Sequence, residues 1–483
     1  MAERTLEEKT TQALSWSFLE SAGVQLIRFV FGVILARLLF PEQFGLIGML
    51  WVFIVVAQSF TDSGYGTALI QRQETTEVDV NSIFYFNIVI GLVAAGIICL
   101  VAPWIAEFFS QPELTSLTRA MSLIIVINSL GNIHFTLIHK RLDFKALTKV
   151  SLIENVLSGT IGIVFAFYGF GVWSLVAQQV SGSIFRTLLL WLLSPWRPAL
   201  VFSFESLRSF FGFGSKMLAS GLLEQIFSNA YQLVIGKLFT PADLGYFTRA
   251  KTFQEVPTNS LSGLVSRVAF PLFSSFQEDS ARLKAGLKKA LTTLGLVHFP
   301  TMIGLAAIAD PLVLALLTDK WAECIPYVRL MCFAGILYPV HLMNLNVLMA
   351  LGRSELFLRL EIIKKVLIVG SIAVTWQWGI SGMIMGLIVL SFLSFYLNSY
   401  FTGKLIGYPA GEQLRDMLPY LGAAIIMGMC VYAFDRLPHA EHWLKLAAEM
   451  ILGIVVYVFL CRISRLTAFM EVWAMGLKRI FGT

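Results

Sequence analysis

The sequence predicts an all-α polytopic membrane protein. Of its 483 residues, 57% are hydrophobic and only 14% are charged, whereas soluble domains carry about 25% charged residues. The mean hydropathy is +0.75, and apolar stretches such as 83–104 and 357–375 recur along the whole chain. Several approach the ~20 residues that a helix needs to cross a bilayer. These observations exclude a secreted domain, a nucleic-acid-binding protein and a disordered scaffold.

Windows of about 19 residues predict about 14 transmembrane helices. In chain order they cover residues 13–38, 44–62, 82–106, 117–138, 150–168, 172–193, 213–239, 246–275, 287–309, 323–350, 356–376, 380–402, 416–434 and 444–463. The first, seventh and eighth windows are the least apolar, and the eighth contains Pro257. An even number of spans puts both termini on the same side of the membrane.

The distribution of lysine and arginine predicts which side that is. The connections after even-numbered helices are rich in these residues, whereas the opposite connections hold only Arg119, Lys320 and Arg436. Among the former are Lys140, Arg141, Lys145, Lys149, Arg282, Lys284, Lys288 and Lys289. Because cytoplasmic loops carry the excess of positive charge, we expect both termini to be cytoplasmic.

The connections offer no room for chemistry outside the membrane. They are too short for a soluble catalytic domain, and the chain has no Walker A, DxD or HExxH pattern. The five cysteines lie in or beside apolar segments without a CxxC pair, as is typical of buried thiols. We therefore expect no enzyme activity, no cofactor, no metal site and no nucleic-acid partner.

An internal repeat appears when the chain is shifted by 200 residues. VILARLLFPEQFG (33–45) then aligns with LVIGKLFTPADLG (233–245), so that Pro41 meets Pro241 and Gly45 meets Gly245. Proline suits the first turn of a helix, and glycine permits close contact between helices. A weaker match pairs 171–174 with 379–382.

The repeat predicts two parallel lobes of six helices each. They would comprise residues 1–200 and 201–410, with two further helices and a cytoplasmic tail in 411–483. Transporters built from parallel repeats bind substrate between the repeats and expose it alternately to the two sides. We therefore expect a central cavity.

Polar and charged residues inside the predicted spans indicate what this cavity binds, because such residues are costly in a membrane and usually mark a site. Helix one carries a stripe of Ser17, Ser21, Gln25, Arg28 and Gly32 at helical spacing; helix seven carries Gln225, Asn229, Gln232 and Gly236; and helix eight carries Arg249, Lys251, Glu255, Asn259 and Arg267. The basic stripes predict a water-filled cavity that attracts an anionic headgroup. The residues predicted to bind this headgroup are Arg28, Arg249, Lys251, Arg267, Gln25, Gln225 and Asn229. Glu20, Glu224 and Glu255 are predicted to pair with these cations or to carry a coupling ion.

Simpler interpretations remain open for several of these residues. Arg249 lies near a helix end, where its side chain reaches the membrane interface. Arg28 has Glu20 or Glu224 as alternative partners, and Glu255 lies one helical turn from Lys251. Glu154 is isolated and is interpreted as a packing or hinge residue rather than part of a site.

Three runs of sequence resemble a known family. LARLLFPEQFGLIGMLWVFIVVAQSFTDSGYGTALIQRQ (35–73), KRLDFKAL (140–147) and GFGVWSLVAQQ (169–179) resemble the bacterial polysaccharide exporters of the multidrug/oligosaccharidyl-lipid/polysaccharide (MOP) flippase superfamily, especially the lipopolysaccharide and colanic-acid type. The resemblance covers nearly the whole chain and is most specific in its N-terminal half.

This resemblance implies a flippase that moves undecaprenyl-diphosphate-linked oligosaccharides from the inner to the outer leaflet. It also implies cavity-lining arginines in helices one and eight, here Arg28 and either Arg249 or Arg267. The implied partners are the lipid-linked oligosaccharide, membrane lipids and a polysaccharide polymerase. Two alternatives stay open: a multidrug/cation antiporter of the same superfamily, which the basic stripes disfavour, and an integral-membrane glycosyltransferase or polymerase.

Overall fold

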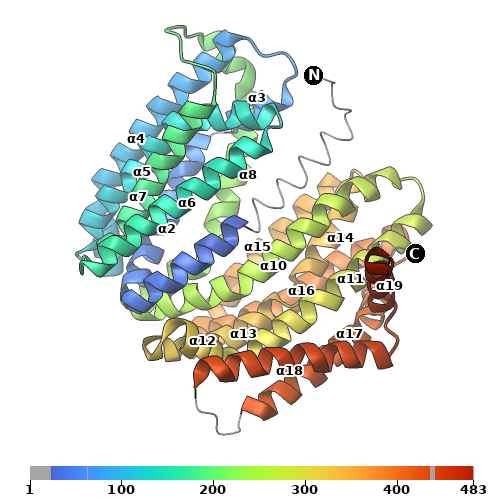
Figure 1. Cartoon of the computed structure of the whole chain (residues 1–483). Coiled ribbons are helices and arrows are strands. Elements are labelled where there is room, and N and C mark those ends of the chain that lie inside the picture. The colour runs from blue at the N-terminus through green and yellow to red at the C-terminus, as the bar shows by residue number, and fades with distance from the viewer. Residues whose placement is uncertain (1–22, 63, 436–440, 482–483) are drawn as a thin grey trace. The chain divides into compact units, whose positions relative to one another are not determined.

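A computed structural model describes residues 23–62, 64–435 and 441–481. Within these ranges the chain forms helices and turns and contains no strand, so the all-α prediction is confirmed. Packing divides the chain into two compact units, Met1–Thr248 and Arg249–Thr483, which are described separately (Figure 1). The division into two lobes of six helices, 1–200 and 201–410, stays a prediction.

The first unit is built from long helices joined by short turns. Residues 23–38 are helical and are followed by α2 (Pro41–Asp62), α3 (Tyr65–Gln71), α4 (Glu77–Phe109), α5 (Leu114–Lys140), α6 (Phe144–Phe167), α7 (Trp173–Leu193), α8 (Phe204–Ser228), α9 (Ala230–Leu238) and the beginning of α10 (Pro241–Ser275). The predicted window 213–239 is divided between α8 and α9. The division occurs at Asn229, whose side-chain Nδ2 donates to the Gln225 carbonyl at 2.8 Å.

The second unit holds the remaining helices. These are the rest of α10, α11 (Ser280–Ala307), α12 (Ala309–Leu317), the 3₁₀ turn η1 (Asp319–Cys324), α13 (Ile325–Gly335), α14 (Tyr338–Ala350), α15 (Ser354–Thr375), the 3₁₀ turn η2 (Trp376–Trp378), α16 (Gly379–Ile406), α17 (Ala410–Asp435), α18 (His442–Ile463) and α19 (Thr467–Phe481). Every predicted window after 246–275 falls on these helices. The window 323–350 is divided between α13 and α14, and α12 and α19 were not predicted.

Nine helical stretches of the described chain are long and apolar enough to cross a membrane. The prediction of about 14 spans is therefore not confirmed. The helices that are not apolar enough to be counted include α7, α8 and α10. Each of them carries charged and amide side chains within its length.

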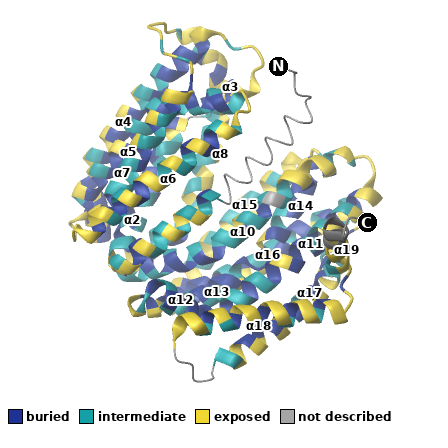
Figure 2. Cartoon of the chain, in the orientation of Figure 1, coloured by how far each residue is buried: buried dark blue, intermediate teal, exposed yellow. Residues whose placement is uncertain are grey.

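The long helices present apolar side chains at their surface. On α4, Val89, Val93, Ile97, Leu100 and Trp104 are all more than half exposed, and their spacing of three or four residues places them on one face of the helix. Figure 2 shows exposed positions along α4 and along α18. An apolar exposed face of this kind suits lipid rather than water, so the chain is a multi-pass membrane protein.

The two copies of the internal repeat meet in the first unit, at the beginning of α2 and of α10. A Cβ atom added at Gly45 would lie 1.7 Å from the Pro241 carbonyl oxygen, and one added at Gly245 would lie 2.0 Å from the Pro41 carbonyl oxygen. The two helices are thus in direct backbone contact, and each glycine rests on the proline of the other copy. The prediction that these glycines permit close contact is confirmed.

Both copies also begin their helix with the same kind of cap. The Phe40 N–H donates to Gln43 Oε1 at 3.0 Å, and the Thr240 N–H donates to Asp243 Oδ2 at 3.1 Å. In each case the side chain three residues later satisfies a backbone donor just before the proline. The cap fixes the position at which each helix begins, and therefore the register of the proline–glycine contact.

A hydrogen-bonded cluster of uncharged side chains holds α14, α16 and α17 together in the second unit. Gln413 Nε2 donates to Asn344 Oδ1 at 3.1 Å and to Thr402 Oγ1 at 3.1 Å, while Gln413 Oε1 accepts from Asn344 Nδ2 at 3.0 Å and from Ser399 Oγ at 3.1 Å. All four residues are at or near complete burial. A fully satisfied buried network specifies one arrangement of the helices.

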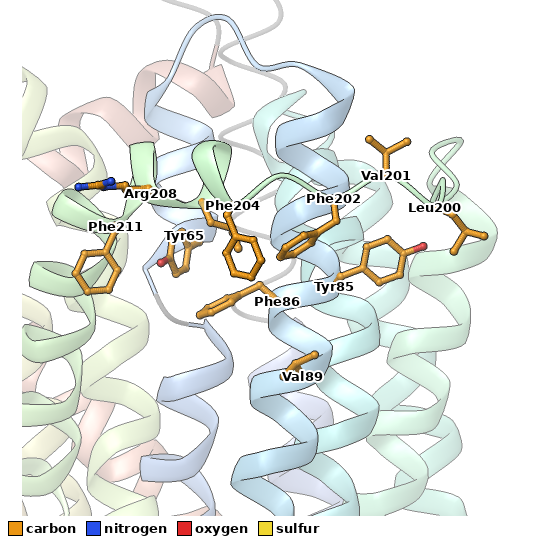
Figure 3. Close-up of a pocket in the computed structure, with 11 residues that line it drawn as sticks. Tyr65, Tyr85, Phe86, Val89, Leu200, Val201, Phe202, Phe204, Arg208 and Phe211 are labelled. Carbon is orange, nitrogen blue, oxygen red and sulfur yellow. The ribbon is translucent and has the colours of Figure 1, made fainter.

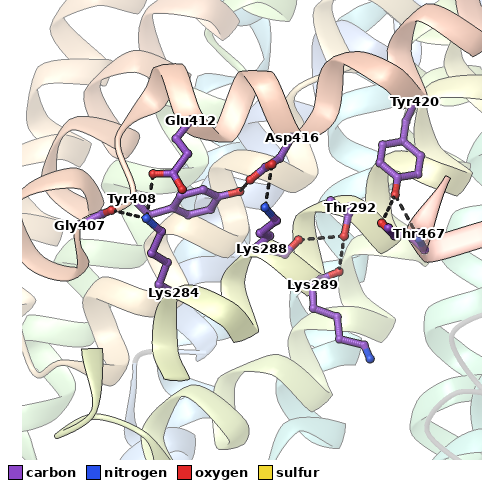
Figure 4. Close-up of polar contacts among 11 residues, drawn as sticks. Lys284, Lys288, Lys289, Thr292, Gly407, Tyr408, Glu412, Asp416, Tyr420 and Thr467 are labelled. Atoms are coloured by element: carbon purple, nitrogen blue, oxygen red, sulfur yellow. Dashed lines mark hydrogen bonds and ion pairs between the residues drawn. The ribbon is translucent and has the colours of Figure 1, made fainter. Parts of the chain in front are cut away.

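Lysines at the beginning of α11 are bound by acidic residues of α17. Lys284 Nζ lies 2.8 Å from Glu412 Oε2, and Lys288 Nζ lies 2.8 Å from Asp416 Oδ1 (Figure 4). The Tyr408 hydroxyl donates to Asp416 Oδ2 at 2.8 Å. Burial, and the hydrogen bond to Asp416, raise the pKa of the Tyr408 phenol, so it stays a neutral donor.

Candidate functional site

Arg28 lines a polar cavity of about 440 Å³ inside the first unit. The lining comes from the helical segment 23–38 and from α2, α5, α6 and α7: Arg28, Phe31, Gly32, Trp51, Gln58, Ile124, Asn128, Glu154, Asn155, Ser158, Gln178, Gln179, Gly182, Ser183 and Arg186. Arg28 Nε donates to Asn155 Oδ1 at 2.8 Å. The guanidinium is thus oriented by α6, and its side chain remains exposed.

Three charged side chains line this cavity, and their sum is one positive charge. Arg28 and Arg186 both act electrostatically on Glu154, and the effect of Arg186 is the larger. Arg186 also lies over the Phe135 ring, with its Cζ 5.3 Å from the ring centroid. One carboxylate between two guanidinium groups leaves positive charge available for an anion.

The cavity combines two kinds of polar group. Arginine presents a planar set of donors that matches two phosphate oxygens at once. The amides of Gln58, Asn128, Gln178 and Gln179 supply both donors and acceptors, which suits neutral hydroxyl-rich groups such as sugars. The cavity volume falls within the range of small-molecule sites, so the arrangement can hold a phosphorylated sugar.

The residues predicted from helix eight lie elsewhere, in the second unit. Arg249 is buried, with its Cζ 5.5 Å from the centroid of the Trp321 ring. Lys251 Nζ lies 3.6 Å from Glu255 Oε1, which is the pairing alternative that the sequence left open. Arg267 is exposed. None of these residues lines the Arg28 cavity, and a role in headgroup binding stays a prediction for them.

The remaining predicted residues lie apart from the cavity lining as well. Gln25 and Asn229 are half-buried, Glu224 is exposed, and the Gln225 carbonyl accepts the hydrogen bond from Asn229. Glu20 lies outside the described residues. Arg28 is oriented by Asn155, a partner that the sequence analysis had not considered.

Most residues of the cavity lining were not among those predicted from the sequence. Glu154 was interpreted as an isolated packing residue, and Arg186 was not considered. A signal was present: Gln179, Ser183 and Arg186 are spaced by four and three residues on α7, as are Asn155 and Ser158 by three on α6. The same helical-stripe criterion that selected Arg28 would have selected them.

A larger cavity of about 850 Å³ lies between the beginning of α3, the first half of α4 and the beginning of α8 with the residues just before it. Figure 3 shows its aromatic lining, including Tyr65, Phe86 and Phe204, with Arg208 at one edge. Arg208 is the only charged residue of that lining. Because an anionic sugar headgroup needs several polar partners, the smaller Arg28 cavity is the better candidate.

Comparison with known proteins identifies relatives along nearly the whole chain. The family described as polysaccharide biosynthesis protein matches residues 34–326, which is more than half of the chain. TuaB, a teichuronic acid biosynthesis protein of Bacillus subtilis, is 26% identical over 474 residues, covering 94% of this chain and 96% of its own. The lipopolysaccharide biosynthesis protein WzxC of Escherichia coli is 28% identical and covers 82% of this chain and 81% of its own. ExoT, a succinoglycan biosynthesis transport protein of Rhizobium meliloti, is 28% identical and covers 94% and 93%.

Solved structures share the fold. The lipid II flippase MurJ in an inward closed conformation matches with a TM-score of 0.74 at 15% identity, covering 95% of this chain and 98% of its own. An inward-facing multidrug resistance MATE transporter of the MOP superfamily matches with a TM-score of 0.64 at 16% identity, covering 79% and 95%. The chain therefore belongs to the polysaccharide biosynthesis protein family and has the fold of the MOP-superfamily transporters.

Proposed function

We propose that this protein flips undecaprenyl-diphosphate-linked oligosaccharide repeat units from the inner to the outer leaflet of the bacterial inner membrane. Transport would proceed by alternating access and supply lipopolysaccharide or exopolysaccharide biosynthesis. The observation that carries the proposal is the polar cavity of about 440 Å³ with Arg28 and Arg186, set within helices whose outer faces are apolar. The names of WzxC, TuaB and ExoT, all of polysaccharide pathways, support it.

The physics of the substrate fits this cavity. A diphosphate-sugar headgroup cannot cross hydrocarbon unaided, whereas its polyprenyl tail can stay in lipid while the cavity shields the head. Because the inside of the membrane is negative, moving two negative charges outward is favourable by about 2.3 kcal/mol per charge per 100 mV, or ~4–5 kcal/mol. The membrane potential therefore supplies a driving force in the required direction.

Replacing Arg28 tests the proposal. A hydrogen bond to a charged group contributes about 1.5–3 kcal/mol, so we expect Arg28→Ala to lower export by about 10- to 150-fold and to make the lipid-linked repeat unit accumulate. Surface polysaccharide and the lipid intermediate would be measured in a deletion strain that expresses each variant at equal level. Arg37→Ala is the matched control, because Arg37 is an exposed arginine of the same helical segment outside the cavity lining. Undiminished export by Arg28→Ala would contradict the proposed role.

The alternative function is multidrug/cation antiport, and the fold that the chain shares with a MATE transporter supports it. The net positive charge of the cavity disfavours a cationic substrate. Expression in a pump-deficient strain would reveal drug resistance if that alternative held. We further propose that the protein is not an enzyme, that both termini are cytoplasmic and that a polysaccharide polymerase acts with it. Incubation with a lipid-linked sugar donor tests the first point, because new glycosidic bonds would indicate an enzyme.

A further inference from the structure

A buried carboxyl group in the second unit has no role in the cavity described above. Glu449 lies in α18, about 10 Å along the helix from its first residue, inside a stretch apolar enough to cross a membrane. Its exposure is 0%. Neither carboxyl oxygen accepts a hydrogen bond from an N–H or O–H donor of the described residues, and the carboxyl group within hydrogen-bond reach is that of Asp435.

The neighbouring cations are already occupied by other carboxylates. Lys445 Nζ lies 2.6 Å from Asp435 Oδ1 and donates to the Asp435 carbonyl at 2.6 Å. Arg329 Nη2 lies 2.5 Å from Asp310 Oδ2. Glu449 therefore lies near two ion pairs and forms none itself with the residues that the structure describes.

The charges around Glu449 do not balance without a proton. Asp435 of α17 and Asp310 of α12 repel a charge on Glu449, and Lys445 attracts it. Among the described residues of this cluster, three carboxyl groups and two cations leave one negative charge in excess. An unpaired buried carboxylate costs several kcal/mol, whereas one added proton makes the cluster neutral.

We propose that Glu449 and Asp435 form a proton-binding site between α17 and α18. In the state described here the proton is on Glu449, whose carboxyl group is then neutral. Release breaks the Glu449 O–H bond and passes the proton to the Asp435 carboxylate and from there to water, because the side chain of Asp435 is partly exposed. Glu449 is left ionised and attracts Lys445.

A proton fits this site better than a metal ion. Hard cations need about six oxygen ligands, and the described residues contain no group of three His, Cys, Asp or Glu side chains that could hold a metal. Lys445 already occupies the cation position beside Asp435.

Infrared spectroscopy of the purified full chain tests proton binding directly, with protons and deuterons as the probe. At neutral pH we expect the carbonyl band of a buried protonated carboxylic acid, shifted in D₂O, in the wild type. Glu449→Gln should lack the band and still fold, because glutamine has the shape of the protonated acid. Glu441→Gln, an exposed glutamate just before the same helix, should retain it. Identical bands in the wild type and Glu449→Gln would overturn the proposal.

A second variant covers the case in which Glu449→Gln does not fold. Asp435→Asn frees Lys445 to pair with Glu449, so Glu449 should ionise and the band should disappear although the glutamate is still present. Persistence of the band in Asp435→Asn would contradict the proposed charge balance.

Coupling of this site to transport rests on the proposed function and has a separate measurement. In proteoliposomes with undecaprenyl diphosphate carrying one sugar as the probe, a pH gradient should change accumulation by about tenfold per pH unit in the wild type and not in Glu449→Gln. If the wild type shows the infrared band and moves the probe without responding to the gradient, the coupling is wrong and the proton site stands. If it shows the band and does not move the probe, the proposed flippase function fails instead.

Discussion

The contact between the two repeat copies makes a sharp prediction at Gly45. Alanine there would place a methyl group 1.7 Å from the Pro241 carbonyl oxygen, roughly half of an ordinary van der Waals separation. Because the opposing atom belongs to the backbone, no side chain can rotate away, and the beginnings of α2 and α10 must separate. Overpacking of this kind costs about 1–3 kcal/mol or more.

The matched control is Gly48→Ala, one helical turn further along α2. Its methyl group would meet two side chains and no backbone atom: Leu244 at 3.3 Å, which can shift by a few tenths of an ångström, and Thr248 at an ordinary contact distance of 3.5 Å. Alanine also favours a helix interior over glycine by about 0.5–1 kcal/mol. We therefore expect Gly48→Ala to be neutral or slightly stabilising.

Thermal unfolding of the purified protein distinguishes the two variants. For a unit of this size, 1 kcal/mol corresponds to about 2–4 °C, so Gly45→Ala should lower Tm by roughly 2–12 °C relative to Gly48→Ala. Gly245→Ala should behave like Gly45→Ala, and the double variant should lose less than the sum, because both methyl groups force the same separation. A Gly45→Ala protein as stable as Gly48→Ala would refute the reasoning.

Two further predictions concern the second unit. Gln413→Leu leaves Asn344 without its amide partner in a buried cluster. We therefore expect the unfolding free energy to fall by about 1–3 kcal/mol. Unchanged thermal stability would show that the cluster does not hold α14 and α17 together. Tyr408 has a raised pKa in the folded protein, so its contribution to stability is complete below a pH of about 10 and is lost as the pH rises above it. Tyr408→Phe should therefore reduce the alkaline fall in Tm, and equal alkaline profiles for the two proteins would contradict this.

Much of the fold could be predicted because local patterns determine it. Hydropathy windows coincide with helices because an apolar segment in lipid must satisfy its own backbone hydrogen bonds. The repeat containing Pro41 and Gly45 predicted close helix contact, and the structure shows that each copy touches the other. The windows 172–193 and 246–275 coincide with α7 and α10, but neither helix is among the nine stretches apolar enough to cross a membrane. Charged and amide side chains lower the mean hydropathy of these two helices without breaking them.

The candidate site was predictable only in part. Arg28 stood out because a charge deep in a predicted span is unusual. Glu154 and Arg186 carry the same signal, but whether a polar side chain faces a cavity or packs in isolation depends on which helices are neighbours. For Arg249, the position near a helix end indicated a side chain at the membrane interface. In the structure this side chain is buried and lies over the ring of the buried Trp321.

All the residues that line the Arg28 cavity come from a single unit. Under the proposed alternating access, its walls therefore need not change between the inward-facing and outward-facing states, and its affinity for a ligand can be the same in both. A ligand that binds two states equally well shifts the balance between them in neither direction. The direction of net movement would then have to be set by an external energy source, such as the voltage across the membrane or a gradient of protons, rather than by how tightly the cargo is held.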